Sequence, residues 1–362
     1  MRRGLAAVTL ALVALAAAGT AGGARTVIPV PLSGLTPFPA SAASWADPQI
    51  KAVTAASILG GDPLTFRPTE PLTRGELAEA LAAFGRPVPL PVDPTKLVSM
   101  HELDARLVAA LGLAAAAKRI RLAARDAGLE PTPMLGTETV ARLLGLRLNH
   151  PQGSDDLELL PSQPATRAEA AYSFARALTV TPDQVAALDQ TTQTFVVPEL
   201  NDWQRAVLGR ALRFVGFPYV WQGTSEKTQQ LWSATAPGGT ITATGGFDCS
   251  GFVWRVYKTK PFAGAPILGD ILKGRTTYAM SAEVKMPARI ALADLTPGDV
   301  VFFGKRGVRS LPAEVGHMGV YVGNGWFVHS SSAGVTLQPM QGWYATSFAW
   351  ARRPLAEAGL VA

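Results

Sequence analysis

The chain has 362 residues, which is long enough for two or three domains at about 100 to 200 residues each. Hydrophobic residues make up 48% of it, and it contains 35 Gly and 28 Pro, so it is neither a disordered chain nor a continuous coiled coil. The formal net charge is +6, and residues 201–362 hold 16 Lys and Arg against 9 Asp and Glu. A basic C-terminal part suits an anionic partner, such as nucleic acid, a membrane surface or a cell-wall polymer, or it serves only to keep the surface soluble.

The N-terminus has the pattern of a secretory signal peptide. Arg2 and Arg3 precede an uncharged, mostly apolar stretch at residues 5–18, and small residues follow at 19–24. The apolar stretch is too short to span a membrane comfortably. We therefore predict a signal peptide at residues 1–24 and no integral membrane segment after its cleavage. The expected location is outside the cell or in the cell envelope, in the periplasm or the cell wall.

Two helices are predicted after the signal peptide. The first begins near Trp45 and ends near Ile58, before a pair of glycines. A loop with an aromatic residue and a proline leads to Thr73-Arg74-Gly75-Glu76, which opens the second helix. Thr-x-x-Glu is a capping box, in which the Thr hydroxyl accepts a hydrogen bond from the backbone N–H three residues on and the Glu reaches back.

A similar phrase returns 93 residues later. Thr166-Arg167-Ala168-Glu169 follows a loop rich in Leu and Pro and opens an apolar helix that ends near Leu178. Both segments resemble the S-layer homology repeat, whose pattern is an aromatic-led helix, a Gly turn, Phe-x-Pro and a Thr-Arg-x-Glu helix. The first copy has Phe66 and Pro68 of that pattern, whereas the second lacks the aromatic loop residue. Residues 101–148 show no copy of their own.

The resemblance predicts an all-α N-terminal part. It has one repeat at residues 38–90 and a helical region with a second, degenerate repeat at residues 99–178. A cell-wall polymer is the implied partner of residues 38–178. The alternative is a helical spacer, because a capping box needs no ligand to explain it.

Residues 179–200 are predicted to be a linker, because they contain Thr-Pro and a cluster of Thr and Gln. A domain at residues 201–355 follows, and it begins with an amphipathic helix from about residue 202 to residue 215.

The only cysteine, Cys249, stands in the phrase Gly-Phe-Asp-Cys-Ser-Gly-Phe. Asp248 is a suitable cap, and an apolar helix follows directly. A thiol in the first turn of a helix meets free backbone N–H groups and the positive end of the helix dipole, which lower its pKa. The same N–H groups can hold an oxyanion. The sequence therefore predicts a reactive thiol, and the alternative is an inert buried cysteine.

Two of the four histidines lie in a predicted β-hairpin. His317 lies in the first strand and His329 in the second, and Gly323-Asn324-Gly325 separates the strands. A two-residue turn would pair Gly323 with Trp326 and turn the two histidines to opposite faces. A three-residue loop would place His329 opposite a glycine, on the same face as His317 and within its reach. We predict the three-residue loop.

A thiol, a base and a second imidazole that orients the base form a cysteine-nucleophile triad. One Cys and two His are also zinc ligands. The sequence contains no Cys-x-x-Cys or His-x-x-x-His pair to support zinc, so we predict no metal and no cofactor.

Residues 201–353 resemble the NlpC-type bacterial cell-wall cysteine peptidases, a papain-like family. The matching motifs are Pro218-Tyr219-Val220-Trp221, Asp248-Cys249-Ser250-Gly251-Phe252, Pro297-Gly298-Asp299-Val300-Val301-Phe302-Phe303, the Gly-His-x-Gly-x-Tyr-x-Gly run at residues 316–323, and His329. The resemblance implies an α+β fold, in which the helix carrying Cys249 packs on an antiparallel sheet.

The resemblance also implies roles for single residues. Cys249 is the implied nucleophile, His317 the general base and then acid, and His329 the orienting residue. Tyr219 is implied to help hold the oxyanion, and Asp248 and Ser250 to line the substrate side. Each of the last three also has an alternative role: Tyr219 as a half-buried packing residue, Asp248 as a helix cap only, and Ser250 as a residue of the first helical turn only. Arg275 is predicted to be a solvated side chain, and the alternative is a contact with the substrate.

These observations predict an exported peptidoglycan hydrolase, a cysteine endopeptidase whose substrate is the stem peptide. By resemblance, the bond cut lies between D-Glu and the diamino residue. The alternatives are an amidase or acyltransferase on the same scaffold, or a non-catalytic wall-binding envelope protein. No nucleic acid is expected, because the basic residues show no interleaved aromatic patch. Two departures from the family pattern are Gln222, where glycine is usual, and the long connection at residues 223–245.

Overall fold

A computed structural model describes residues 44–148, 158–234, 236–258 and 268–360. The predicted signal peptide and the start of the first repeat lie outside the described residues. Within the described ranges, no helix has both the length and the apolar character that a membrane span requires.

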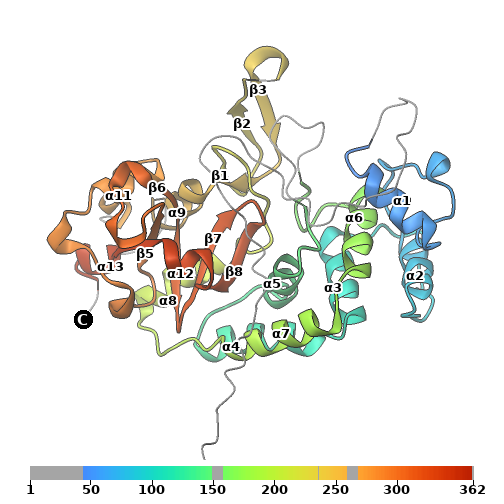
Figure 1. Ribbon diagram of the computed structural model, residues 1–362, viewed down its shortest axis with the longest axis horizontal. Helices are drawn as coiled ribbons and strands as arrows, with labels where there is room; N and C mark the ends of the chain where they lie inside the picture. The colour runs from blue at the N-terminus through green and yellow to red at the C-terminus, as the bar shows by residue number, and fades with distance from the viewer. Residues whose placement is uncertain (1–43, 149–157, 235, 259–267, 361–362) are drawn as a thin grey trace, which may run out of the picture.

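The N-terminal part is built of helices, as predicted (Figure 1). They are α1 (Asp47–Ala55), α2 (Arg74–Ala83), α3 (Met100–Ala110), α4 (Ala114–Asp126), α5 (Leu135–Leu143), α6 (Arg167–Leu178) and α7 (Pro182–Gln193). Helix α7 lies within the segment that we expected to be a linker. It packs on α4, where the Arg119 guanidinium donates hydrogen bonds to the side chains of Asp189 and Thr192.

Three chain segments meet in a triangle at the centre of these helices. The backbone N–H of Leu72 donates a hydrogen bond to the carbonyl of Ala165, and the N–H of Ala165 donates to the carbonyl of Val98. The N–H of Val98 donates to the carbonyl of Leu72 and closes the triangle, in which all three bonds are 2.7–2.9 Å long. Each of the three residues is followed by a capped helix, α2, α3 or α6. The helical part therefore contains three equivalent units arranged around a pseudo-threefold axis.

The middle unit corrects the sequence analysis, which found no copy between the two repeats. Its helix cap is Ser99, whose hydroxyl accepts a hydrogen bond from the backbone N–H of Glu102, just as Thr73 and Thr166 do in their units. Ser-x-x-Glu serves the same capping purpose as Thr-x-x-Glu. Met100 occupies the place of the arginine, and this substitution hides the copy in the sequence.

The C-terminal part is α+β, as predicted. Its main sheet is antiparallel, with strand order β8-β7-β6-β5-β9. The strands are β5 (Val300–Gly304), β6 (Val315–Gly323), β7 (Trp326–Ser331), β8 (Gly334–Pro339) and β9 (Phe348–Arg352). Helix α9 (Cys249–Lys258) packs on β6 and β7, and α8 (Asp202–Leu212) packs on α9. The sheet is thus covered by the helix that carries the cysteine.

Short elements complete this part of the chain. The helices are α10 (Leu268–Ile271), α11 (Thr277–Ala282), α12 (Trp343–Ser347) and α13 (Pro354–Glu357). The described residues of the long connection at 223–245 form β1 (Thr224–Ser225), β2 (Gln229–Trp232) and β3 (Thr240–Ala243), and β4 (Gly246–Phe247) follows. Strands β2 and β3 form a hairpin that projects from the body of the molecule (Figure 1).

The turn between β6 and β7 differs from the prediction. Gly323 pairs with Trp326, so the turn has two residues, Asn324 and Gly325, with φ of 46° and 77°. These positive angles fit a type I′ turn, which matches the twist of the strands. An irregularity between Tyr321 and Gly323 shifts the register by one residue. The shift restores the predicted outcome, because a Cβ on Gly319 would lie only 2.9 Å from the Cβ of His329.

Candidate active site

Cys249 is the first residue of α9, as predicted. Asp248 caps this helix, since its Oδ1 accepts a hydrogen bond from the backbone N–H of Gly251 and another from the Ser250 hydroxyl, the latter at 3.0 Å. The Cys249 Sγ lies 3.3 Å from the Oγ1 of Thr277, at the start of α11. The thiol therefore sits between the N-terminus of one helix and the first residue of another.

The electrostatics of the thiol correct the expected direction of its pKa. Burial raises the pKa of Cys249 to about 11, and the neighbouring carboxylate of Asp248 adds to the rise. The Thr277 hydroxyl and the backbone N–H groups of α9 lower the pKa but do not offset these effects. The sequence shows the helix start, but it does not show how much water the fold removes from the sulfur. The free protein therefore holds a neutral thiol.

The two predicted histidines meet. The Nε2 of His317 lies 2.8 Å from the Nδ1 of His329, and their rings are nearly perpendicular. His329 is fully buried and stacks on the ring of Phe327 at 4.4 Å between centroids. This contact occupies Nε2 of His317 and leaves its Nδ1 as the nitrogen available to a thiol.

Burial also keeps both imidazoles neutral. It lowers the pKa of His317 to about 4. It lowers the pKa of His329 well below the usual value, an effect that His317 reinforces and the side chain of Gln338 opposes. At neutral pH the site thus combines an uncharged thiol with an uncharged base. This arrangement suits proton transfer during nucleophilic attack rather than a permanent ion pair.

Tyr219 lies close to the thiol. It pairs in parallel with Phe247, two residues before Cys249. Burial raises the pKa of Tyr219, and the neighbouring Cys249 and Asp248 raise it further, so its hydroxyl stays protonated. A protonated phenol beside the nucleophile can donate a hydrogen bond to a developing oxyanion.

Arg275 is not a freely solvated side chain, which corrects our interpretation. Its guanidinium donates hydrogen bonds to the Ser250 hydroxyl at 2.9 Å and to the backbone carbonyl of Gln222 at 3.1 Å. It also forms an ion pair with Asp248 at 3.3 Å. Asp248, Ser250 and Arg275 thus form one polar cluster next to the nucleophile.

Gln222 shows why the family pattern has glycine at this position. Its φ is +65°, in the left-handed region that side chains other than glycine adopt at a cost. Its carbonyl is the group held by Arg275. The strain therefore lies directly beside the polar cluster.

Sequence reasoning missed two further residues near Cys249 and the histidine pair. Thr277 contacts the sulfur, and Tyr344 of α12 packs against both histidine rings at 5.0 and 5.8 Å between centroids. Burial raises the pKa of Tyr344 to about 12, while side-chain hydrogen bonds with Ser331 and Gln338 lower it. A Thr-Thr pair and a tyrosine are common in any sequence, so no motif identifies them beforehand.

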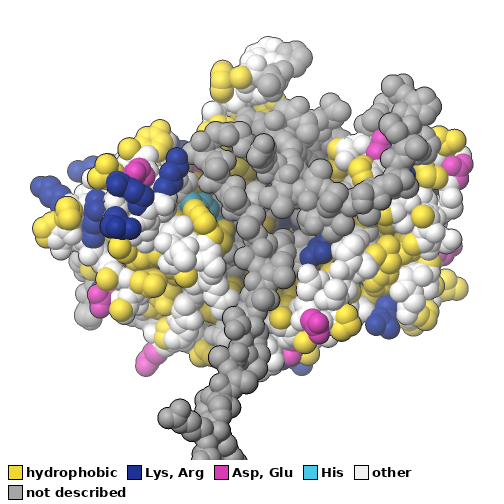
Figure 2. All heavy atoms as spheres, viewed as in Figure 1, with side chains coloured by type: hydrophobic (Ala, Val, Ile, Leu, Met, Phe, Trp, Pro, Cys, Tyr) yellow, Lys and Arg dark blue, Asp and Glu magenta, His cyan; other side chains and the backbone are white. Residues whose placement is uncertain are grey.

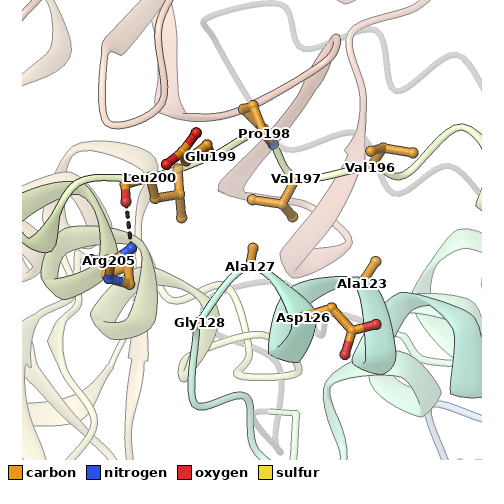
Figure 3. A pocket seen from close by; sticks show the side chains of 10 residues that line it. All are labelled: Ala123, Asp126, Ala127, Gly128, Val196, Val197, Pro198, Glu199, Leu200 and Arg205. Atoms are coloured by element: carbon orange, nitrogen blue, oxygen red, sulfur yellow. Dashed lines mark hydrogen bonds between the residues drawn. The ribbon is translucent and has the colours of Figure 1, made fainter.

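Other features lie away from this centre. A cavity of about 620 Å³ lies between the end of α4 and residues 196–200, and neither Cys249 nor the two histidines line it (Figure 3). Among the described residues, no group of three or more His, Cys, Asp or Glu side chains is placed to hold a metal ion.

Alkylation of the thiol tests the electrostatics of the site. Because the chain has a single cysteine, iodoacetamide reports on Cys249 alone. With a pKa of about 11, the rate should keep rising through the alkaline range and show no plateau near neutral pH. Glutathione under the same conditions gives the behaviour of an ordinary thiol. A plateau below roughly pH 8 would instead indicate a stable thiolate–imidazolium pair.

Comparison with known families confirms the resemblance of the C-terminal part to the cell-wall peptidases and that of the first helical repeat to the S-layer homology domain. Residues 216–353 match the model of the NlpC/P60 family, and residues 39–78 match that of the S-layer homology domain.

Individual relatives match the C-terminal part. Murein DD-endopeptidase MepH of Escherichia coli is 31% identical over 134 residues, which are 37% of this chain and 38% of that protein. The bifunctional muramidase/DL-endopeptidase CwlT of Bacillus subtilis is 31% identical over 144 residues, 40% of this chain and 34% of that protein. The chain spans about a third of the length of these curated relatives. A solved NlpC/P60 family protein from Bacillus cereus is 25% identical, with a TM-score of 0.31, over 45% of this chain and 43% of that one.

Proposed function

We propose that the chain, whose residues 216–353 match the NlpC/P60 family, is an exported peptidoglycan endopeptidase with a Cys249–His317–His329 triad. The observation that carries the proposal is the geometry of the triad. A single thiol begins a helix that packs on the two strands of the histidine pair, and the pair leaves one imidazole nitrogen free for the thiol.

The reaction is a two-step acyl transfer. Nδ1 of His317 takes the thiol proton while the Cys249 sulfur attacks the carbonyl carbon of a stem-peptide amide. The Tyr219 hydroxyl and the backbone N–H of Cys249 stabilise the oxyanion. The C–N bond then breaks, and His317 gives the proton to the leaving amine. Water, deprotonated by His317, attacks the thioester and releases the new carboxylate together with the free thiol.

The bond proposed is that between D-Glu and the diamino residue. The name of CwlT supports a D,L bond, whereas the name of MepH specifies a D,D bond at the same identity. The cluster of Asp248, Ser250 and Arg275 supports recognition of a charged stem peptide, since it offers both signs of charge beside the nucleophile. Mass spectrometry of the products from purified peptidoglycan identifies the bond. A free D-Glu γ-carboxylate supports the proposal, and products cut only elsewhere refute it.

The same product analysis distinguishes the endopeptidase from the alternative functions. An amidase would release the intact stem peptide from the glycan, and an acyltransferase would join stems or require a second nucleophile. A wall-binding protein without catalysis would release nothing. The basic side chains over the C-terminal part support attraction to an anionic wall (Figure 2).

The helical part is proposed to bind a cell-wall polymer. A cavity of about 520 Å³ lies between α2 and α3, two of the three equivalent units, and its lining includes Arg74, Lys96 and Arg106. Arg74 is already paired with Glu102, whereas Lys96 and Arg106 are exposed. The lining also includes Asp93 beside Lys96, so the exposed groups of this cavity leave a small excess of positive charge for an anionic chain. The proposed location is the cell envelope or the extracellular space.

Replacing both exposed cations tests polymer binding. The Lys96→Ala/Arg106→Ala protein should co-sediment with purified cell walls roughly tenfold less than wild type, because two charges at one cavity are lost. The control is Lys118→Ala/Arg125→Ala, which removes two exposed cations from α4. Equal loss in both variants would show a diffuse charge effect and contradict a polymer site at this cavity.

A further inference from the structure

The helical part packs directly against the C-terminal part. Helix α5 packs against β8 at the edge of the sheet (Figure 1). Arg142 of α5 extends across this junction, and its side chain is fully buried. It forms an ion pair of 2.6 Å with Glu158, which is also fully buried and pairs with Arg147 at 2.9 Å as well. A buried arginine that crosses between two parts of a chain joins them rigidly.

The guanidinium of Arg142 holds two backbone carbonyls of the catalytic part. It donates to Ala333 at 2.7 Å and to Gly216 at 2.5 Å. Ala333 lies in the turn between β7 and β8, and Gly216 lies in the segment that leads from α8 to Tyr219. One side chain therefore fastens two segments that are more than 100 residues apart in the sequence.

Both fastened segments carry residues of the candidate active site. Gly216 precedes Tyr219 by three residues, and Ala333 follows His329 by four. The segments pair with each other, since the N–H of Gly216 donates to Val335 and that of Val335 donates to Phe217. Arg142 binds where this pairing ends, so it sets the position of both segments together.

The two glycines at the junction fit this close approach. Gly216 and Gly334 both have positive φ, of 97° and 78°. A Cβ on Gly216 would lie 2.6 Å from an oxygen of Glu138, and one on Gly334 would overlap the Arg142 guanidinium. The catalytic part therefore approaches the buried charges of the helical part without room for a side chain.

We propose that Arg142 is a positioning residue for the active site, through which the helical part holds Tyr219 and His329 in their catalytic places. The proposal rests on the proposed function, because it concerns the same triad. A displacement of about 1 Å at catalytic groups can cost up to roughly 10²-fold in rate, so a residue outside the site can control turnover.

The test uses the full chain and a soluble stem peptide. Arg142→Met should lower kcat roughly tenfold or more and change KM by less than about threefold, because orientation is lost and substrate contacts are kept. Arg142→Lys should have an intermediate effect, since an ammonium keeps the charge beside Glu158 but lacks the fork that reaches two carbonyls.

Arg167→Met is the matched control. Arg167 is also buried, pairs with Glu76 at 2.6 Å, and donates to the carbonyls of Phe66 and Leu59 at 2.7 Å each. These hydrogen bonds all stay within the helical part. Its loss should lower stability as much as that of Arg142 while leaving kcat within about twofold of wild type. Equal kcat in the two methionine variants, compared at equal folded fraction, would overturn the proposal.

Two measures keep the outcome decisive. If Arg142→Met does not fold, Arg142→Gln and Arg142→Lys carry the comparison, because Glu158 keeps its ion pair with Arg147 in both. Alkylation of Cys249 provides a readout without substrate, and its rate should change roughly threefold or more in the Arg142 variants only. An inactive wild type would refute the proposed function, whereas unchanged alkylation in the Arg142 variants would refute the positioning role.

Discussion

Replacing Cys249 with alanine should abolish release of peptide products from peptidoglycan, with a fall in kcat/KM of roughly 10⁴-fold or more. The chain has no second thiol that could take over the attack. The oxyanion donors and the polar cluster at Asp248 remain, so binding of the stem peptide should change little. The measurement is product release from purified peptidoglycan, followed by mass spectrometry.

The control for this result is the folded state of the variant. The side-chain neighbour of Sγ is the hydroxyl of Thr277, and alanine keeps the backbone of α9, so the substitution removes the partly buried thiol and little else. The melting temperature should therefore stay close to that of wild type. Serine is a second control, because it keeps a hydroxyl near Thr277 but is a much weaker nucleophile. Cleavage by the alanine variant at more than about 1% of the wild-type rate would contradict covalent catalysis by Cys249.

The predictable part of the site follows from local rules. Asp248 and Cys249 begin an apolar helix, and a capping residue followed by apolar periodicity predicts the start of a helix. The two histidines lie in strands separated by a glycine-rich turn, which marks a hairpin. Local signals thus predicted the thiol and the histidine pair, whereas the α+β class followed from the resemblance to the NlpC-type family.

The part that could not be predicted depends on tertiary contacts. The irregularity after Tyr321 shifts the strand register by one residue and so compensates for the two-residue turn. No sequence pattern predicts this irregularity. Arg275 finds Ser250 and Gln222 only because the fold brings them together. The direction of the Cys249 pKa depends on burial, which a sequence does not measure.

The middle helical unit was not predicted for a different reason. Its capping pair, Ser99 and Glu102, is present in the sequence, but Met100 breaks the Thr-Arg-x-Glu pattern. In the other two units the arginine pairs with a glutamate of a neighbouring unit, Arg74 with Glu102 and Arg167 with Glu76. The triangle of backbone hydrogen bonds identifies the unit independently of side-chain identity. Structure detects the repeat because the backbone geometry survives the loss of its motif.

Replacing His329 with leucine should lower kcat roughly 10²-fold to 10⁴-fold with little change in KM. For His317 to act as the base, its Nε2 must donate its proton to the Nδ1 of His329, 2.8 Å away, so that its own Nδ1 is unprotonated. Without the acceptor, the other tautomer and other ring orientations become available, and the base faces the thiol for less of the time. Asparagine offers an acceptor oxygen at a similar place and should retain most of the activity, within about tenfold of wild type.

Stability against pH separates this role from packing. Burial lowers the pKa of His329 well below its usual 6.5, so the unfolded chain takes up a proton that the native protein does not as the pH falls from about 7 to about 5. Wild type should lose stability in that window, and the leucine variant should lose less, since it lacks this group. A leucine variant that is as stable as wild type near neutral pH but inactive supports an orienting role. Full activity in the leucine variant would mean that His317 needs no partner, and the triad would reduce to a dyad of Cys249 and His317.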